Sequence, residues 1–109
     1  MAVYVIIEIK VRDRDAYCEY VEKVRPVVER CGGRYLCRGG AVTPVSGSWN
    51  PERIVLIEFP SVGDVLKCFN SEEYRGIAHL RERSTEGRAI IVEGEADGGC
   101  DVRSDGFNL

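Results

Sequence analysis

Alternation between apolar and polar positions predicts several strands along the chain. Residues 2–10 and 53–59 are rich in valine, isoleucine and leucine, and both stretches alternate as strands do. Residues 34–38 and 88–93 predict two shorter strands, and residues 41–45 are expected to continue in an extended conformation. These stretches are too short to span a membrane, which takes roughly 20 apolar residues in a helix.

The first segment between strands has the spacing of a helix. Apolar residues recur at three- and four-residue steps over residues 12–31, which predicts one amphipathic helix. Asp13 or Asp15 is suited to cap its start, and Gly32-Gly33 is suited to end it. Pro26 lies inside the pattern and lacks a backbone donor, so we expect it to kink or split the helix.

A second helical region precedes the last strand and is interrupted once. Residues 61–69 and 72–85 both have helical spacing, with a polar break between them. The predicted order is therefore β-α-β-β-α-β with the second helix in two parts. A short internal repeat supports two similar halves, because Val-Ile-Ile-Glu-Ile at 5–9 is similar to Val-Leu-Ile-Glu-Phe at 55–59. This order is typical of the α+β, ferredoxin-like fold with an antiparallel four-stranded sheet.

Strand alternation separates the two faces of the predicted sheet. The helices should cover the uniformly apolar face, which carries Val3, Val5, Ile7, Ile9, Val55, Ile57 and Phe59. The second face mixes apolar and charged side chains, namely Tyr4, Ile6, Glu8, Lys10, Ile54, Leu56 and Glu58. A contiguous apolar group usually marks an interface, so we expect two copies to pack these faces together and bury about 1,200–2,000 Å². A monomer that tolerates an exposed apolar face is the alternative.

The charge of the chain is concentrated at one end. The net charge is −3, and all of it lies in residues 95–109, where four carboxylates accompany only Arg103. Residues 1–95 are expected to form the ferredoxin-like domain, and residues 96–109 a flexible acidic tail. Because the chain lacks a basic footprint, we expect no nucleic-acid partner.

Cysteine and histidine usage argues against a metal or haem site. The five cysteines include no C-x-x-C pair, and His79 is the single histidine, on a helix face that we expect to be solvated. No leader precedes the first strand, so we expect reduced thiols and a cytoplasmic location. We expect no bound cofactor and no membrane partner.

Several short motifs resemble one protein family. They are Arg38-Gly39-Gly40, Glu58-Phe59-Pro60-Ser61, Ser71-Glu72-Glu73-Tyr74 and Val92-Glu93-Gly94, with Arg25-Pro26 and Arg81 at fitting spacings. The motifs occur in the order seen in the domain-of-unknown-function 1330 family, which the chain resembles over roughly residues 2–95. The resemblance implies a dimeric α/β barrel, a superfamily that includes cofactor-independent monooxygenases, small isomerases and lyases, and ligand-binding regulatory domains. Cys68-Phe69 departs from the aromatic pair, often Trp-Tyr, that this family usually has.

Two carboxylates lie inside otherwise apolar strands. Burying a carboxylate is costly unless it is paired, so Glu8 and Glu58 need partners or a function. Glu58 is a candidate general acid or base in a cavity. The alternative for both is an ion pair across the barrel interior or dimer seam, with Arg38, Arg81 or Lys10 as the partner. We favour the ion pair for both residues, most strongly for Glu8.

Cationic and tyrosine side chains are candidates for ligand binding. Arg81 continues an apolar helix stripe that includes Tyr74, and could bind a carboxylate either of a ligand or of the protein. Arg38 precedes two glycines, which are expected to form either an anion site or a structural bulge or sharp bend. Tyr17, Tyr20 and Tyr74 could donate hydrogen bonds to a ligand or simply pack in the core.

No motif in the chain specifies a reaction. Our first hypothesis is a homodimer that binds a small anionic or aromatic metabolite between helices and sheet. Glu58 would then serve cofactor-free proton transfer, while Arg81, Arg38, Tyr17 and Tyr74 would bind the ligand. A cofactor-free oxygenase, with the substrate as reductant, is a further form of this hypothesis. The alternative is a non-catalytic binding or regulatory dimer whose charged interior is structural.

Overall fold

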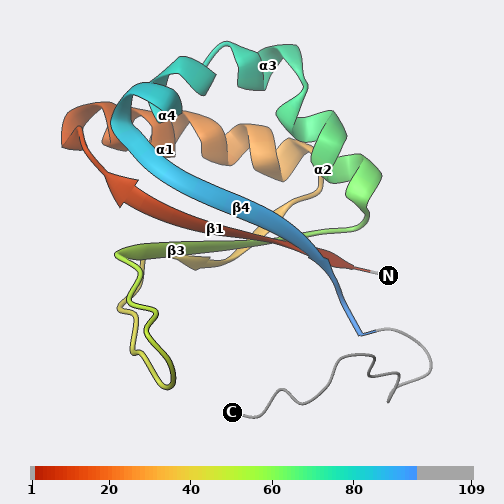
Figure 1. The fold of residues 1–109 in the computed structure, drawn as a ribbon. Helices are drawn as coiled ribbons and strands as arrows, with labels where there is room; N and C mark the ends of the chain where they lie inside the picture. The colour runs from red at the N-terminus through yellow and green to blue at the C-terminus, as the bar shows by residue number, and fades with distance from the viewer. Residues whose placement is uncertain (1, 96–109) are drawn as a thin grey trace.

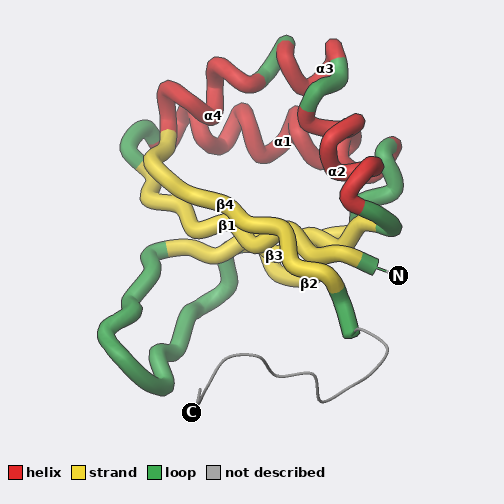
Figure 2. The backbone as a smooth tube through the Cα atoms, turned by 45° about the vertical axis from the view of Figure 1, so that its right-hand side comes forward, coloured by secondary structure: helices red, strands yellow, loops and turns green. Residues whose placement is uncertain are grey.

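Four antiparallel strands form one open sheet in the computed structural model, which describes residues 2–95 (Figure 1). The strands are β1 (Val3–Val11), β2 (Arg34–Arg38), β3 (Arg53–Phe59) and β4 (Thr85–Glu93), in the spatial order β2-β3-β1-β4. The helices are α1 (Arg14–Arg30), α2 (Val62–Phe69), α3 (Glu72–Arg75) and α4 (Ala78–Ser84). All four helices lie on one face of the sheet (Figure 2). The predicted α+β, ferredoxin-like fold is confirmed, although one chain alone does not close into a barrel.

The two similar segments, residues 5–9 in β1 and 55–59 in β3, belong to neighbouring strands in the centre of the sheet. β1 and β3 run antiparallel, with Val5 opposite Ile57 and Ile7 opposite Val55. Alternation therefore sends the odd-numbered residues of both strands toward the helices, where Ile57 is 2% exposed and Phe59 1% exposed. This arrangement confirms the predicted covered face and leaves the opposite face without helices.

Helix α1 packs its apolar stripe on this covered face. The side chain of Asp13 accepts a hydrogen bond from the backbone N–H of Ala16, which makes Asp13 the N-cap. Val28 is fully buried in the core. The expected split at Pro26 is wrong, because α1 continues through this residue to Arg30.

The region between β3 and β4 forms three short helices, where the sequence predicted two parts. Ser61 caps α2 and Ser71 caps α3 through their side chains. The additional break falls at Gly76-Ile77, where the backbone N–H of Ile77 bonds to the carbonyl of Tyr74 and tightens the turn. Glycine has low helix propensity, which favours an interruption at this point.

The connection from β2 to β3 differs from the sequence prediction. The bulge lies at Leu36, between Tyr35 and Cys37, whereas Gly39 has the sharp bend that was the alternative to a bulge at Gly39-Gly40. Gly39 begins the loop with a positive φ of 81°, a conformation that favours glycine. Residues 41–45 form no strand. The whole loop projects beyond the sheet face that lacks helices (Figures 1 and 2).

The last strand is longer than predicted. β4 begins at Thr85, three residues before the expected start, and pairs with β1 along its whole length. The predicted flexible tail at 96–109 lies outside the described residues. Within residues 2–95, no helix has the length and apolar character needed to cross a membrane.

Candidate functional site

A cleft lies between the helix-covered side of the sheet and helices α1 to α4. Its inner part holds about 40 Å³ between α1 and the sheet. Its outer part holds about 550 Å³ between β4 and helices α2 to α4. Ile7, Tyr20, Phe69 and Arg81 line both parts, so the two are continuous. We call the whole the helix–sheet cleft.

Two tyrosines from different helices meet in the wall of this cleft. The hydroxyls of Tyr20 on α1 and Tyr74 on α3 are 2.9 Å apart and hydrogen bond. Burial is the main cause that raises the pKa of Tyr20 well above its usual value, and the neighbouring Tyr74 raises it further. Tyr20 therefore stays neutral at physiological pH and is suited to hydrogen bonding, not to acting as a base.

Aromatic rings extend this wall toward the outer part of the cleft. The ring of Phe69 lies 4.8 Å from that of Tyr74 in an edge-to-face arrangement. On the opposite side, β4 contributes Ile91, which pairs with Val5 of β1. The outer cleft is thus predominantly apolar and has room for a small flat molecule.

Arg81 lies at the junction of the inner and outer parts. It comes from α4 and remains solvent-exposed. Within the described part of the chain, the five ion pairs all use other arginines or a lysine, and the guanidinium of Arg81 makes no side-chain hydrogen bond to protein. The charge is close enough to Tyr20 to lower the pKa of that phenol slightly against the stronger effect of burial. Among residues 2–95, Arg81 thus has no carboxylate partner.

Tyr17 and Arg38 line the inner part but already have protein partners. The Nε of Arg53 donates a 2.8 Å hydrogen bond to the hydroxyl of Tyr17. The Nη2 of Arg38 donates a 2.5 Å hydrogen bond to the carbonyl of Val21 on α1, and its guanidinium lies over the Tyr35 ring. These contacts fasten α1 to β2 and β3. They give Tyr17 and Arg38 a structural role whether or not a ligand is present.

Glu58 is not in the helix–sheet cleft. It points to the helix-free face, since its neighbours Ile57 and Phe59 are buried beneath the helices. Its carboxylate accepts hydrogen bonds from Arg34, at 2.8 Å from Nη2 and 3.2 Å from Nε. That bond is the main cause that lowers the pKa of Glu58. The structure therefore separates Glu58 from Arg81, Tyr17 and Tyr74, with which the sequence had grouped it.

The ion-pair partners expected for Glu8 and Glu58 are also corrected. Glu58 pairs with Arg34, which lies directly opposite it on β2. Glu8 pairs with Arg88, directly opposite it on β4, at 2.7 Å. The expected partners were Arg38, Arg81 and Lys10. The cross-strand register decides these pairs, and the register was not available from the residue pattern alone.

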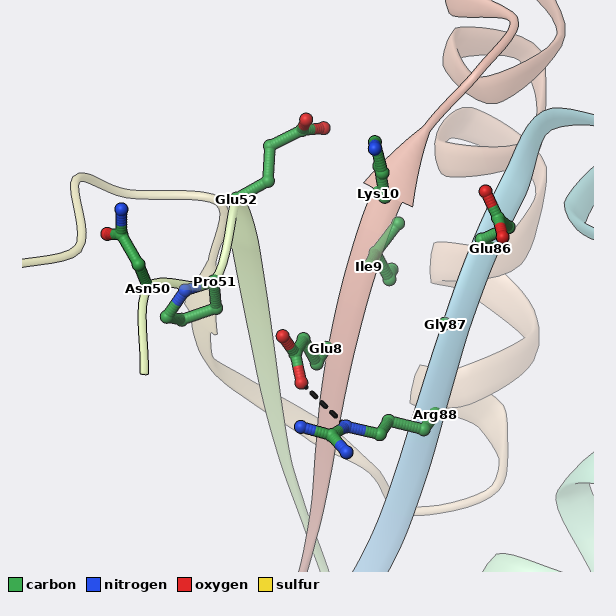
Figure 3. A pocket seen from close by; sticks show the side chains of 9 residues that line it. All are labelled: Glu8, Ile9, Lys10, Asn50, Pro51, Glu52, Glu86, Gly87 and Arg88. Atoms are coloured by element: carbon green, nitrogen blue, oxygen red, sulfur yellow. Dashed lines mark hydrogen bonds and ion pairs between the residues drawn. The ribbon is translucent and has the colours of Figure 1, made fainter. Parts of the chain in front are cut away.

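A second hollow of about 480 Å³ lies at one end of the helix-free face (Figure 3). Glu8 and Arg88 point toward each other there, while Glu52 and Glu86 point away from this pair. Glu52 accepts a hydrogen bond from the backbone N–H of Val11. No group of three or more potential metal ligands occurs among the described residues. Glu8, Arg88 and Glu52 of this hollow thus have partners within the protein.

Comparisons with known proteins agree on fold and family. The profile of the domain of unknown function DUF1330 matches residues 2–95, and no curated protein sequence matches the chain. A protein of unknown function from Rhodopseudomonas palustris is 19% identical, with a TM-score of 0.75, over 87% of this chain and 83% of that one.

Two further solved structures are similar at lower identity. SnoaB, a cofactor-independent oxygenase from Streptomyces nogalater, is 9% identical with a TM-score of 0.63, over 90% of this chain and 97% of that one. A dimeric protein of unknown function and ferredoxin-like fold from Bacteroides fragilis is 15% identical with a TM-score of 0.50, over 84% and 95%. These likenesses establish the fold.

Proposed function

The chain belongs to the DUF1330 family of unknown function, and from that premise we propose that it is a homodimer whose protomers each bind a small anionic aromatic molecule in the helix–sheet cleft. The observation that carries the binding proposal is that Arg81, which has no carboxylate partner among residues 2–95, lies at a mainly apolar cleft. A planar guanidinium binds a carboxylate through two parallel hydrogen bonds.

The walls of the cleft complement the aromatic part of such a ligand. Phe69 and Tyr74 offer ring edges and faces, and Ile91 offers an aliphatic surface opposite them. Besides Arg81, the hydrogen-bonded hydroxyls of Tyr20 and Tyr74 belong to residues that line the outer part of the cleft. One charged contact with an apolar surround is a common design of small-molecule sites, since the polar group orients the ligand and the apolar surface provides affinity.

Cofactor-free proton transfer at this cleft has weaker support than binding. Glu58, the expected proton shuttle, lies on the other face and is held ionised by Arg34. Tyr20 is neutral because burial raises its pKa. Neither group supplies a base inside the cleft. We therefore favour the alternative of a non-catalytic binding or regulatory dimer, in which the charged residues of the helix-free face are structural.

The binding proposal is tested with 2-naphthoate as the probe and 2-naphthalenemethanol as its neutral counterpart. We expect 2-naphthoate to bind at least about tenfold more tightly than the alcohol in isothermal titration calorimetry, because only the acid pairs with Arg81. Arg81→Met should remove this difference. Arg83→Met is the matched control, since Arg83 lies on the same helix outside the cleft lining. Equal affinity of the two probes for the unmodified protein would contradict the proposal.

The helix-free face supports the dimer proposal. The central strand β1 contributes Ile6 to this face, and the neighbouring edge strand β4 contributes Ile90 and Val92, which are 60% and 41% exposed. The ion pairs Glu8–Arg88 and Glu58–Arg34 lie on the same face. Two such faces can pack about 10 Å apart, as sheets do in sandwiches, and cover the apolar centre. The dimeric relative from Bacteroides fragilis has the same fold, which is consistent with this assembly.

Sedimentation velocity tests the dimer. We expect a dimer at micromolar concentration, and a monomer for Ile90→Asp, because a buried unpaired carboxylate in the seam is costly. Val62→Asp is the control, since Val62 is 39% exposed at the start of α2, on the helix side of the sheet. A monomeric unmodified protein would refute the proposed assembly.

A further inference from the structure

A further hollow lies beside the start of helix α1 and the start of strand β3. It holds about 620 Å³, a volume typical of small-molecule sites. Tyr17 and Val21 line both this hollow and the inner part of the helix–sheet cleft, whereas Arg81 lines only the cleft. Three arginines line the hollow, namely Arg12, Arg14 and Arg53. We call it the arginine hollow.

The protein holds the guanidinium of Arg53 in a fixed position. Its Nε donates a 2.8 Å hydrogen bond to the hydroxyl of Tyr17, and its Cζ lies 5.1 Å from the centre of the Tyr17 ring. The guanidinium also packs against Gly39, because a Cβ at position 39 would overlap with Cζ and both Nη atoms. The bond to Tyr17 uses one of the five guanidinium donors, and the other four, on Nη1 and Nη2, form the planar end that binds oxyanions. Arg53 therefore has the fixed, planar geometry of an anion-binding side chain.

Arg12 and Arg14 add two more positive charges to the arginine hollow. The Nη2 of Arg12 donates hydrogen bonds to the backbone carbonyls of Glu82 and Thr85, at 3.2 and 3.1 Å, so the protein also holds this side chain. Arg14 is the first residue of α1 and is exposed. Among residues 2–95, no carboxylate forms an ion pair with any of the three arginines. A group with more than one negative charge is therefore favoured at this end of the hollow.

Two carboxylates, Glu22 and Glu52, also line the arginine hollow. Glu52 accepts a 3.0 Å hydrogen bond from the backbone N–H of Val11. Glu22 lies eight residues after Arg14 on α1, which separates their backbones along the helix by about 12 Å. Carboxylates repel a phosphate but accept hydrogen bonds from hydroxyl groups. The hollow thus combines guanidinium groups suited to a phosphate with carboxylates suited to a hydroxylated organic part.

We propose that the arginine hollow binds a phosphomonoester whose organic part carries hydroxyl groups, with Arg53 as the principal contact of the phosphate. A phosphomonoester presents three acceptor oxygens and carries nearly two negative charges at neutral pH, so more than one guanidinium can bind it at once. A carboxylate presents only two oxygens and one charge, which a single guanidinium satisfies. This site goes beyond the small-molecule site proposed above and does not depend on it.

Isothermal titration calorimetry of the full-length protein, in phosphate-free buffer, tests this site with ribose 5-phosphate as the probe. We expect ribose without its phosphate not to bind, and inorganic phosphate to bind more weakly than the sugar phosphate. Arg53→Met should weaken binding of the sugar phosphate at least about tenfold, because it removes charge-assisted hydrogen bonds. Arg14→Met, at an exposed position, should weaken it about threefold. Arg75→Met is the matched control and should not change binding, because Arg75 is exposed on α3 outside the lining of the hollow.

Three results would overturn the proposed phosphate site or its ligand. The site fails if ribose 5-phosphate does not bind at millimolar concentration, or if Arg53→Met and Arg14→Met bind it as tightly as Arg75→Met. It also fails if Arg81→Met abolishes binding while Arg53→Met does not, since the sugar phosphate then occupies the helix–sheet cleft. Equal affinity for inorganic phosphate and the sugar phosphate would overturn the organic part of the ligand. Should Arg53→Met fail to fold, as judged by circular dichroism, the comparison of Arg14→Met with Arg75→Met decides alone.

Discussion

The hydrogen bond between Tyr20 and Tyr74 offers a quantitative test of how the cleft wall is held together. Both residues are nearly buried, at 8% and 6% exposure, and their hydroxyls are 2.9 Å apart. Tyr74→Phe removes one hydroxyl and leaves that of Tyr20 buried without this partner. An unsatisfied buried hydroxyl costs about 1–3 kcal/mol, so we expect unfolding free energy to fall by that amount. Tyr20→Phe should cost a similar amount for the same reason.

The double variant distinguishes this explanation from simple loss of packing. When both hydroxyls are absent, two apolar rings remain in edge-to-face contact, and no polar group is left unpaired. We therefore expect Tyr20→Phe/Tyr74→Phe to be about 1–2 kcal/mol more stable than the sum of the single effects predicts. Urea unfolding followed by circular dichroism, at one fixed protein concentration, measures all four proteins. Strictly additive effects would refute the proposed hydroxyl pairing.

Three further predictions concern other parts of the molecule. Burial raises the pKa of Tyr35 to about 12. The stabilisation that comes from keeping the Tyr35 phenol neutral is therefore present below pH about 10 and is lost between pH about 10 and 12. Alkaline titration, followed by tyrosinate absorbance and circular dichroism, should show the ionisation of Tyr35 together with unfolding. Gly87→Ala should lower the free energy of unfolding by about 1–3 kcal/mol, because an added Cβ would collide with a β1 carbonyl. Gly40→Ala is the control. It should be neutral in the same denaturant assay, because a Cβ added at Gly40 meets nothing within 4 Å. Burial also raises the pKa of the Cys68 thiol to about 12, so a thiol reagent should label exposed Cys18 rapidly and Cys68 only on unfolding; fast native labelling of Cys68, mapped by mass spectrometry, would contradict its burial.

The sequence predicted best those strands and helices in which burial of one face makes apolar residues recur at a regular spacing. β3 was expected at 53–59 and occupies those residues, because alternate side chains of this central strand must face the helices. β4 was expected to start at 88, and its first three residues, Thr85 to Gly87, were missed. β4 is exposed over almost its whole length and is held by pairing with β1, so its start leaves no apolar pattern.

The candidate site was predicted less completely, for a related reason. Arg81, Tyr17, Tyr74 and Arg38 do line the helix–sheet cleft. Helical spacing predicted this for the three residues on helices, whereas Arg38 was singled out only because it precedes two glycines. Glu58 was grouped with them by its unusual setting in an apolar strand. Strand alternation already assigned it to the other face, and that signal should have excluded it from the cleft. The partners of the carboxylates depend on strand register, which single-sequence patterns do not contain.

The long loop between β2 and β3 carries an intrinsic fluorophore, the indole of Trp49. It carries Trp49, the single tryptophan of the chain, which is 56% exposed beside a hollow of about 290 Å³ that Ile6 and Ile90 help to line. Native tryptophan emission therefore originates at the margin of the helix-free face and not in the core. A blue shift on concentrating the protein would register water leaving this margin as two copies meet, without any label or substitution.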